Sequence, residues 1–316
     1  MENVKSTVVS QATEGESQEN SQSLATTFLT EDEIKAVCPM AFMAEPTNKS
    51  VSNKYMVAKT IDVVQDLEKL GWKCVKAVCR KKGKKSSGRF SYHALFFQNP
   101  DVVMNKTLPD GTTVVEGYPR IILTNSLDGF NSFKFGCGFY RLACSNGLIL
   151  ATAKLTEFSI RHIHYDFNEL KELVTRIVAE LPNAVERINQ MEGFTLTLDQ
   201  RLTLAKEAYA IRRGIEADKL EVDNETLQDM LEPFRKEDAG DSLWKTLNIV
   251  QERIVKGNFM AANKNGKVRK VKAIQSFVTD LAVNRKLWKV AEEYLPVPGA
   301  LEEIITTTTT AAEVVS

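Results

Sequence analysis

Hydrophobic residues recur at two different periods along the chain, and the change of period separates expected strands from expected helices. Between about residues 53 and 70 they recur every three or four positions, and Gly71 follows. This spacing predicts an amphipathic helix that ends at the glycine. A shorter helix is predicted to begin at Thr30, whose hydroxyl can cap an acidic first turn.

From residue 72 the apolar positions alternate, in segments rich in β-branched and aromatic residues. Gly, Asn, Asp or Pro separates these segments, a pattern that is typical of strands joined by turns. Six strands are predicted, at 72–80, 89–98, 113–125, 132–142, 148–153 and 155–164.

The helical period returns at Asp166 and continues almost to the C-terminus. Pro182 is expected to bend or restart the first of these helices. Four more are predicted at about 198–213, 224–232, 243–257 and 278–294. The order predicts an α+β fold: an N-terminal helix, a mostly antiparallel sheet of five or six strands, and a helical C-terminal half.

The same pattern divides the chain into four regions. Residues 1–28 are predicted to be a disordered acidic tail and 296–316 a disordered tail, because they have little to bury. Residues 29–164 are predicted to form the sheet region, and 165–295 a helical region that packs on it. No apolar run approaches the roughly 20 residues of a membrane span, and no signal-like segment opens the chain. We therefore expect a soluble, cytoplasmic protein.

Charge is unevenly distributed along the sequence. The chain carries 41 Lys and Arg against 41 Asp and Glu, a net charge of zero. Residues 53–163 nevertheless carry 17 Lys and Arg against 8 Asp and Glu, a net charge of +9, and both flanks are acidic. A basic segment between acidic flanks indicates an anionic partner.

A basic stretch followed by aromatic residues is the strongest candidate for a binding site. Six cations fall within ten residues, at the turn between the first two predicted strands: Arg80, Lys81, Lys82, Lys84, Lys85 and Arg89. The next strand carries Phe90, Tyr92 and Phe96 at alternate positions, which places the three rings on one face. Cations hold phosphates, and ring faces stack on unpaired bases for about 1–3 kcal/mol each. The stretch predicts a platform for single-stranded nucleic acid.

Other basic residues could extend this platform. Lys73 and Lys76 add charge on the preceding strand, and Arg141 could reach a phosphate from the fourth strand. A second basic cluster, at 264–272, is predicted to be a loop that either widens a nucleic-acid channel or is only solvated. The alternative for the first cluster is that its rings belong to the core and its lysines to a solvated turn.

Two parts of the sequence carry a resemblance to a known family. They are TNSLDGF at 124–130 with FYRLACSNGL at 139–148, and LWKTLNIVQE at 243–252, to which Leu287, Trp288 and Ala291 add. They resemble a phage- and plasmid-associated family, the domain-of-unknown-function family numbered nine hundred and thirty-two. The resemblance covers most of 53–295 and implies a mobile-element origin in a bacterial host. It implies no activity and no catalytic residues.

The five cysteines, Cys38, Cys74, Cys79, Cys137 and Cys144, include no CxxC pair. They are expected to be buried thiols in a reducing compartment. Cys137 and Cys144 could instead share a disulfide or a metal across a turn.

Catalytic patterns are scarce in the sequence. No GxxxxGK[ST] loop and no GxSxG turn occurs. His162, His164 and Asp166 alternate, so a continued strand would align two imidazoles and a carboxylate as a metal triad. Asp166 also suits the N-cap of the next helix, which breaks that geometry. We therefore predict no metal site, no cofactor and no enzymatic activity, with a metal-dependent hydrolase as the alternative.

Together these features favour a phage or plasmid accessory protein that binds single-stranded nucleic acid without strong sequence preference. Such a protein would act in DNA metabolism, annealing or strand protection. The alternative is a non-enzymatic protein–protein interaction factor that acts on host machinery or defence. The long amphipathic helices of the C-terminal half could pair within one chain or between chains, so the sequence leaves an oligomer open.

Overall fold

The computed structural model divides the chain into two compact units. Unit 1 takes residues 1–189 and 273–285, and unit 2 takes 190–272 and 286–316. The structure describes residues 6–9, 27–45, 59–79, 92–107, 111–127, 133–141, 147–150, 158–160, 166–262 and 266–295. Two long helices each contribute residues to both units, so the division does not coincide with the sheet and helical regions expected from the sequence.

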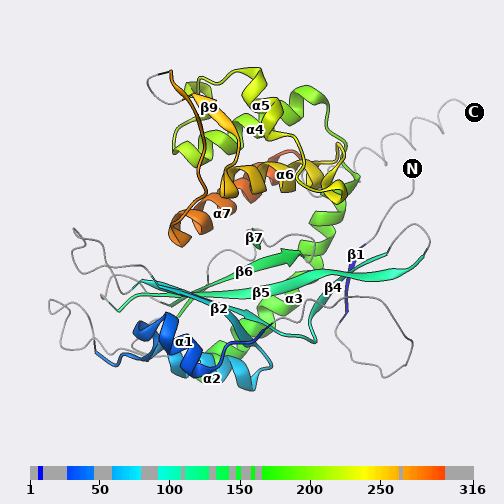
Figure 1. Cartoon of the computed structure of the whole chain (residues 1–316). Coiled ribbons are helices and arrows are strands. Elements are labelled where there is room, and N and C mark those ends of the chain that lie inside the picture. The colour runs from blue at the N-terminus through cyan, green and yellow to red at the C-terminus, as the bar shows by residue number, and fades with distance from the viewer. Residues whose placement is uncertain are drawn as a thin grey trace, which may run out of the picture. The chain divides into compact units, whose positions relative to one another are not determined.

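Unit 1 is built on an antiparallel sheet (Figure 1). Its strands are β1 (Ser6–Val9), β2 (Lys73–Cys79), β3 (His93–Gln98), β4 (Val103–Thr107), β5 (Thr113–Asn125), β6 (Phe133–Arg141), β7 (Gly147–Leu150) and β8 (Phe158–Ile160). The long β5 pairs with β4 and then β3 along one edge, and with β6 along the other. Strand β2 pairs with β3, while β7 and β8 pair with β6. The predicted α+β class and antiparallel sheet are confirmed.

Two strands of this sheet were not predicted. Strand β4 lies between predicted strands and is short, with Asn105 and Lys106 interrupting its apolar residues. Strand β1 lies within the tail predicted to be disordered, and for Ser6–Val9 that prediction is wrong. Its run of Thr and Val favours a strand, and β4 offers an edge with which it pairs. The remainder of residues 1–26 is outside the described part of the chain.

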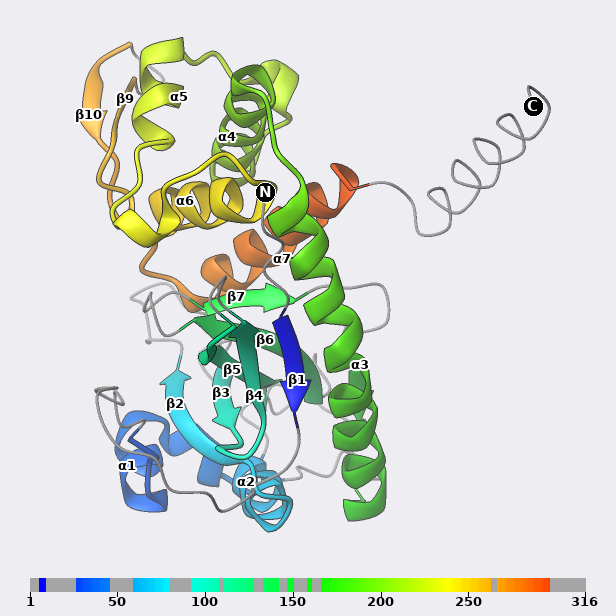
Figure 2. The ribbon, with the colours of Figure 1, turned by 90° about the vertical axis from the view of Figure 1, so that its right-hand side faces the viewer.

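Helices α1 (Glu31–Val37) and α2 (Thr60–Lys69) lie together on one side of the sheet (Figures 1 and 2), and the 3-10 turn η1 (Pro39–Phe42) follows α1. Helix α1 begins with the expected cap: Glu33 N donates to Thr30 Oγ1 at 3.3 Å, and Thr30 N donates to Glu33 Oε2 at 2.8 Å. Helix α2 buries one apolar face and ends before Gly71, which has a φ of 82°.

Helix α3 (Phe167–Gly193) runs through Pro182 without a break, so the restart that was one of the two expected effects of this proline does not occur. Pro182 is exposed, while Leu181 and Ala184 on either side of it are buried. The carbonyl that loses its partner to a proline on a solvent-facing side can hydrogen-bond to water, whereas the apolar stripe continues to pack. Near the start of α3, Lys69 Nζ lies 5.7 Å from the centroid of the Phe167 ring.

The register of the strands defines two faces of the sheet. One face carries Leu95, Phe97, Ile121 and Leu123, all fully buried. The first part of α7 (Phe277–Glu293) lies against the other face, which carries Lys76, Tyr92, Phe96, Ile122, Thr124 and Lys134. The second face therefore contains the side chains that matter for a binding site.

Unit 2 is mainly helical. Its elements are α4 (Leu198–Arg213), η4 (Ala217–Lys219), α5 (Asn224–Met230), η5 (Lys236–Asp238), α6 (Leu243–Lys256), β9 (Met260–Ala262) and β10 (Val268–Lys270), with the end of α7. Helix α6 has 11 buried residues and contacts α4 and α5. The cluster at 264–272 was predicted to be a loop, but β10 pairs with β9 as an antiparallel hairpin. Each of its strands has only three residues, too few to show an alternating apolar pattern. Within the described ranges, no helix combines the length and apolar character needed to cross a bilayer.

Candidate nucleic-acid interface

The predicted binding residues lie almost entirely outside the described part of the chain. These residues are Arg80, Lys81, Lys82, Lys84, Lys85, Arg89 and Phe90, all within 80–91. Arg141 is described through its backbone alone, as the last residue of β6, opposite Gly117. Tyr92 is the predicted site residue whose side chain the structure describes, so the roles of the others stay predictions.

Tyr92 does not lie on an open platform. Its ring is half-buried and stacks on Phe277 of α7, with centroids 5.7 Å apart and planes 6° from parallel. One face of the ring is therefore covered by the protein itself. A base could stack only on the opposite face of the ring. The prediction from the sequence therefore assumed more free ring surface than Tyr92 has.

Phe96 lies on the same sheet face and is also half-buried. Lys76, its cross-strand neighbour on β2, places Nζ 5.3 Å from the centroid of the Phe96 ring. This is a cation–π geometry, in which the ring holds the ammonium group above it. Phe97 points to the other face and is fully buried. Of the two aromatic residues of β3, Phe97 thus belongs to the core, and Phe96 lies on the other face beside Lys76.

Further cations border this face, and the sequence analysis did not group them. Arg120 of β5 donates to Gln98 Oε1 from Nη2 at 3.2 Å and from Nε at 3.4 Å. Lys134 of β6 pairs with Thr124 of β5. A shallow hollow beside them is lined by Ile122, Thr124, Lys134, Phe135, Gly136, Leu281 and Arg285. Only tertiary contact brings Arg285 and Phe277 of α7 to this face, so no local signal could have found them.

Asp280 adds a carboxylate to the same face. Burial raises the pKa of the Asp280 carboxyl above its ordinary value, although the positive charge of Lys76 acts in the opposite direction. Asn284 Nδ2 donates to Asp280 Oδ1 at 2.7 Å. The face is therefore mostly cationic at its described edges, with one half-buried carboxylate, on α7, whose ionisation is opposed by its burial.

A buried polar cluster lies at the ends of β3 and β5, on the opposite face. Thr60, His93 and Asn125 are fully buried. Thr60 Oγ1 lies 2.8 Å from His93 Nε2 and accepts a hydrogen bond from Asn125 Nδ2 at 2.9 Å. Ser126 N donates to Asn125 Oδ1 at 2.6 Å. The cluster joins α2 to two strands, and its full burial fits a structural role.

The described cysteines are free thiols, and Cys38, Cys74 and Cys137 are buried as expected. Burial raises the pKa of Cys74 and of Cys137 to about 12 each. A hydrogen bond between Cys38 and Cys79 raises the pKa of Cys38 and lowers that of the half-buried Cys79. Cys144 is outside the described residues, so a bond between it and Cys137 stays untested.

The metal triad considered from the sequence is only partly visible. His162 and His164 are outside the described ranges, while Asp166 is exposed just before α3 and its carbonyl accepts from Leu170 N. Among the described residues, no group of three or more His, Cys, Asp or Glu side chains could hold a metal ion.

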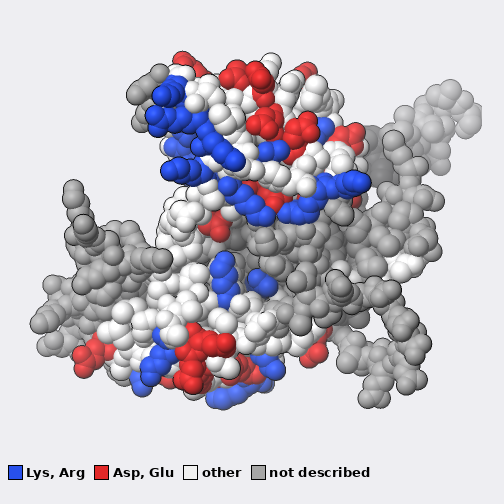
Figure 3. All heavy atoms as spheres, in the orientation of Figure 1, with Lys and Arg blue, Asp and Glu red and all other residues white. Residues whose placement is uncertain are grey.

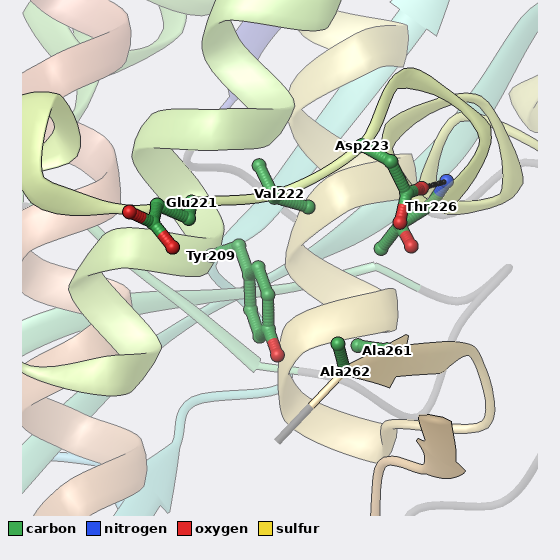
Figure 4. Close-up of a pocket in the computed structure, with 7 residues that line it drawn as sticks. All are labelled: Tyr209, Glu221, Val222, Asp223, Thr226, Ala261 and Ala262. Carbon is green, nitrogen blue, oxygen red and sulfur yellow. Dashed lines mark hydrogen bonds between the residues drawn. The ribbon is translucent and has the colours of Figure 1, made fainter. Parts of the chain in front are cut away.

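Unit 2 contains a cavity of about 310 Å³ (Figure 4). It is lined by Tyr209, Glu221, Val222, Asp223, Thr226, Ala261 and Ala262. Thr226 N donates to Asp223 Oδ1 at 2.6 Å, and this bond lowers the pKa of the Asp223 carboxyl. Asp223 thereby caps α5, and its carboxylate is already engaged by the protein.

Comparison with known proteins gives a family but no activity. A family model described as "Domain of unknown function (DUF932)" matches residues 47–288. The chain belongs to this family. It is 26% identical over 267 residues to the UPF0380 proteins YafZ and YfjQ of Escherichia coli (strain K12), covering 84% of this chain and 92% of each relative. No solved structure matches the chain. The resemblance noted in the sequence is thus confirmed for the family.

Proposed function

We propose that the protein binds single-stranded nucleic acid, without strong sequence preference, at the face of unit 1 that carries Lys76 and Phe96. The observation that carries the proposal is the pairing of Lys76 with the half-buried Phe96 ring on this face. Lys134 lies on the same face, two strands away from Phe96. Residues 80–91, with their six cations, connect the ends of β2 and β3 on which this pair lies.

The physical basis is the release of counterions from phosphates. Each phosphate that a Lys or Arg neutralises releases condensed cations, which favours binding and makes it salt-dependent. Arg80, Lys81, Lys82, Lys84, Lys85 and Arg89 are the proposed phosphate-binding residues, with Arg141 as a further one. Phe90 is the proposed stacking ring, because one face of Tyr92 is occupied by Phe277. Tyr92 then supports the start of β3 and offers its second face.

The test is a titration of a labelled single strand of about 20 nucleotides with the full chain, between about 50 and 200 mM salt. A variant with Lys81→Ala, Lys82→Ala, Lys84→Ala and Lys85→Ala removes four proposed phosphate-binding cations. Its affinity should fall, and the slope of log affinity against log salt should decrease by about 0.7 for each phosphate that is no longer neutralised.

A matched control removes four exposed lysines elsewhere: Lys171, Lys219, Lys236 and Lys289. It lowers the net charge by the same amount, so it separates a local site from the effect of total charge. Equal losses of affinity in both variants would show that the binding is only nonspecific attraction. If the wild-type chain binds no single strand at all, the proposal is wrong, and the alternative of an acidic protein partner for the basic residues is favoured.

A further inference from the structure

The β9–β10 hairpin of unit 2 has a firmly held base. Asn258 N donates to Val271 O at 2.9 Å, and Val271 N donates to Phe259 O at 2.8 Å, which extends the pairing beyond the two short strands. The Arg212 guanidinium donates to the carbonyls of Ile254 and Lys272. The two ends of the hairpin are therefore tied together and to α4.

The inner side of the hairpin is packed into unit 2. Phe259 is 1% exposed, and its ring meets Tyr209 edge to face, with centroids 5.4 Å apart and planes at 82°. Ala261 is also buried. A buried ring and a tied base hold strands β9 and β10 in one orientation, so these two strands do not have to be ordered when a partner binds.

The outer part of the hairpin is exposed and basic. Strand β10 is exposed along its whole length, and the exposed cations of this segment are Lys267, Arg269, Lys270 and Lys272. No acidic residue occurs from 257 to 272. In Figure 3, Lys and Arg gather over this part of unit 2. The segment thus presents positive charge on a preformed ribbon.

The cations lie on both faces of the ribbon. Arg269 pairs with Ala261 and shares its face, whereas Lys270 pairs with Met260 on the other. Met260 is 48% exposed and Val268, on the same face as Lys270, is 56% exposed. The face of Arg269 and Ala261 is the one that packs toward unit 2, so a partner meets the face of Met260, Val268 and Lys270 and the two edges of the ribbon.

We propose that the β9–β10 hairpin binds duplex nucleic acid by lying in a groove, with its cations on the two flanking phosphate backbones. A two-stranded β-ribbon fits the major groove of B-form DNA, and known β-ribbon proteins read DNA in this way. Met260 and Val268 would then face sugars and base edges. The proposal goes beyond the function proposed above, because it concerns another unit and another form of nucleic acid.

The experiment measures binding of the full chain to a labelled duplex of about 20 base pairs between about 50 and 200 mM salt. The hairpin variant carries Lys267→Gln, Arg269→Gln, Lys270→Gln and Lys272→Gln. We expect duplex affinity to fall about tenfold or more, and the log–log salt slope to decrease by about 0.9 for each phosphate that is no longer neutralised. Affinity for the single strand should stay close to that of the wild-type chain.

Two controls make the result decisive. Lys219→Gln, Lys236→Gln, Lys286→Gln and Lys289→Gln remove the same charge from exposed positions of unit 2. Lys267→Arg, Lys270→Arg and Lys272→Arg keep the charge on the hairpin and should keep duplex binding. Unchanged duplex binding in the Gln hairpin variant, an equal loss in the displaced-charge control, or no duplex binding by the wild type overturns the proposal. The function proposed for unit 1 is judged separately. If the variant with Ala at 81, 82, 84 and 85 (the 81–85 variant) loses single-strand binding and the hairpin variant does not, that proposal stands whatever the duplex result.

Discussion

At the scale of single residues, the cluster of Thr60, His93 and Asn125 is the most demanding polar feature of unit 1. All three side chains are fully buried, and the Thr60 hydroxyl lies between the imidazole and the amide. Thr60 Oγ1 accepts a hydrogen bond from Asn125 Nδ2 and shares a second one with His93 Nε2, whose direction is set by the tautomer of the imidazole. One hydroxyl therefore satisfies two buried groups.

Thr60→Val keeps the shape of the side chain but removes this hydroxyl. We expect the free energy of unfolding to fall by about 2 kcal/mol, because two buried polar groups each lose a partner. Urea unfolding followed by circular dichroism measures the change. Thr175→Val is the matched control, since its hydroxyl donates to Lys171 O from an exposed position, and it should change stability by less than about 0.5 kcal/mol. Equal effects of the two variants would show that the cluster contributes nothing.

Asp280 is the second residue whose environment makes a prediction. Its pKa is raised in the folded protein, mainly by burial, so folding favours its protonated form. A carboxyl of this kind supports the folded state fully below its unfolded pKa, and that contribution is lost as pH rises through the folded pKa. Above that range the buried carboxylate reduces stability.

Asp280→Asn should therefore stabilise the protein at pH 7, and the gain should shrink toward zero as pH falls to the ordinary Asp pKa of about 3.9. The amide oxygen can still accept from Asn284. Thermal unfolding of both proteins at several pH values measures the difference. Asp101→Asn removes a charge from an exposed turn and should have an effect below about 0.5 kcal/mol. A loss of stability at pH 7 in Asp280→Asn would mean that attraction to Lys76 outweighs burial.

At the scale of elements, the hairpin shows how one glycine can fix the position of a ribbon. Gly257 follows α6 with a φ of 70° and a ψ of −131°, a backbone conformation that residues other than glycine rarely adopt. A Cβ at this position would lie 2.4 Å from Val271 O, an atom of the backbone that cannot easily move. The close approach lets Asn258 pair with Val271 directly after the helix.

Gly257→Ala should cost about 3 kcal/mol or more of folding free energy, because backbone strain and a steric clash add. Gly214→Ala is the comparison, since Gly214 ends α4 with a φ of 67° but no atom lies within 4 Å of the place that an alanine methyl would take. It should cost only about 1 kcal/mol, the penalty of the left-handed conformation alone. Urea unfolding measures both, and similar costs would contradict the close approach.

At the scale of the whole molecule, a net charge of zero conceals two basic segments of the sequence, 80–91 in unit 1 and 264–272 in unit 2. Because a charge is largely screened beyond about 10 Å at 0.1 M salt, each proposed site should bind through the charges around it rather than through the net charge of the chain. The 81–85 variant should then lose affinity for the single strand, and the hairpin variant should lose affinity for the duplex. The division into units is also why each variant should be compared with a control of equal charge.

The sequence alone determined the elements whose signals are local. The Thr30 cap predicted the start of α1, and the limits of β5 and α4 were read directly from alternation and three- to four-residue spacing. These features depend on neighbours within a few residues, so the chain encodes them without help from the fold.

Tertiary structure decided what distant residues do to one another. Strand β1 forms because β4 offers it an edge, and Pro182 stays within α3 because its side of the helix faces solvent. Phe277, 185 positions away in sequence, covers one face of Tyr92 and changes what that ring can bind. Burial and ring stacking arise from packing in space, and no periodicity along the chain carries that information.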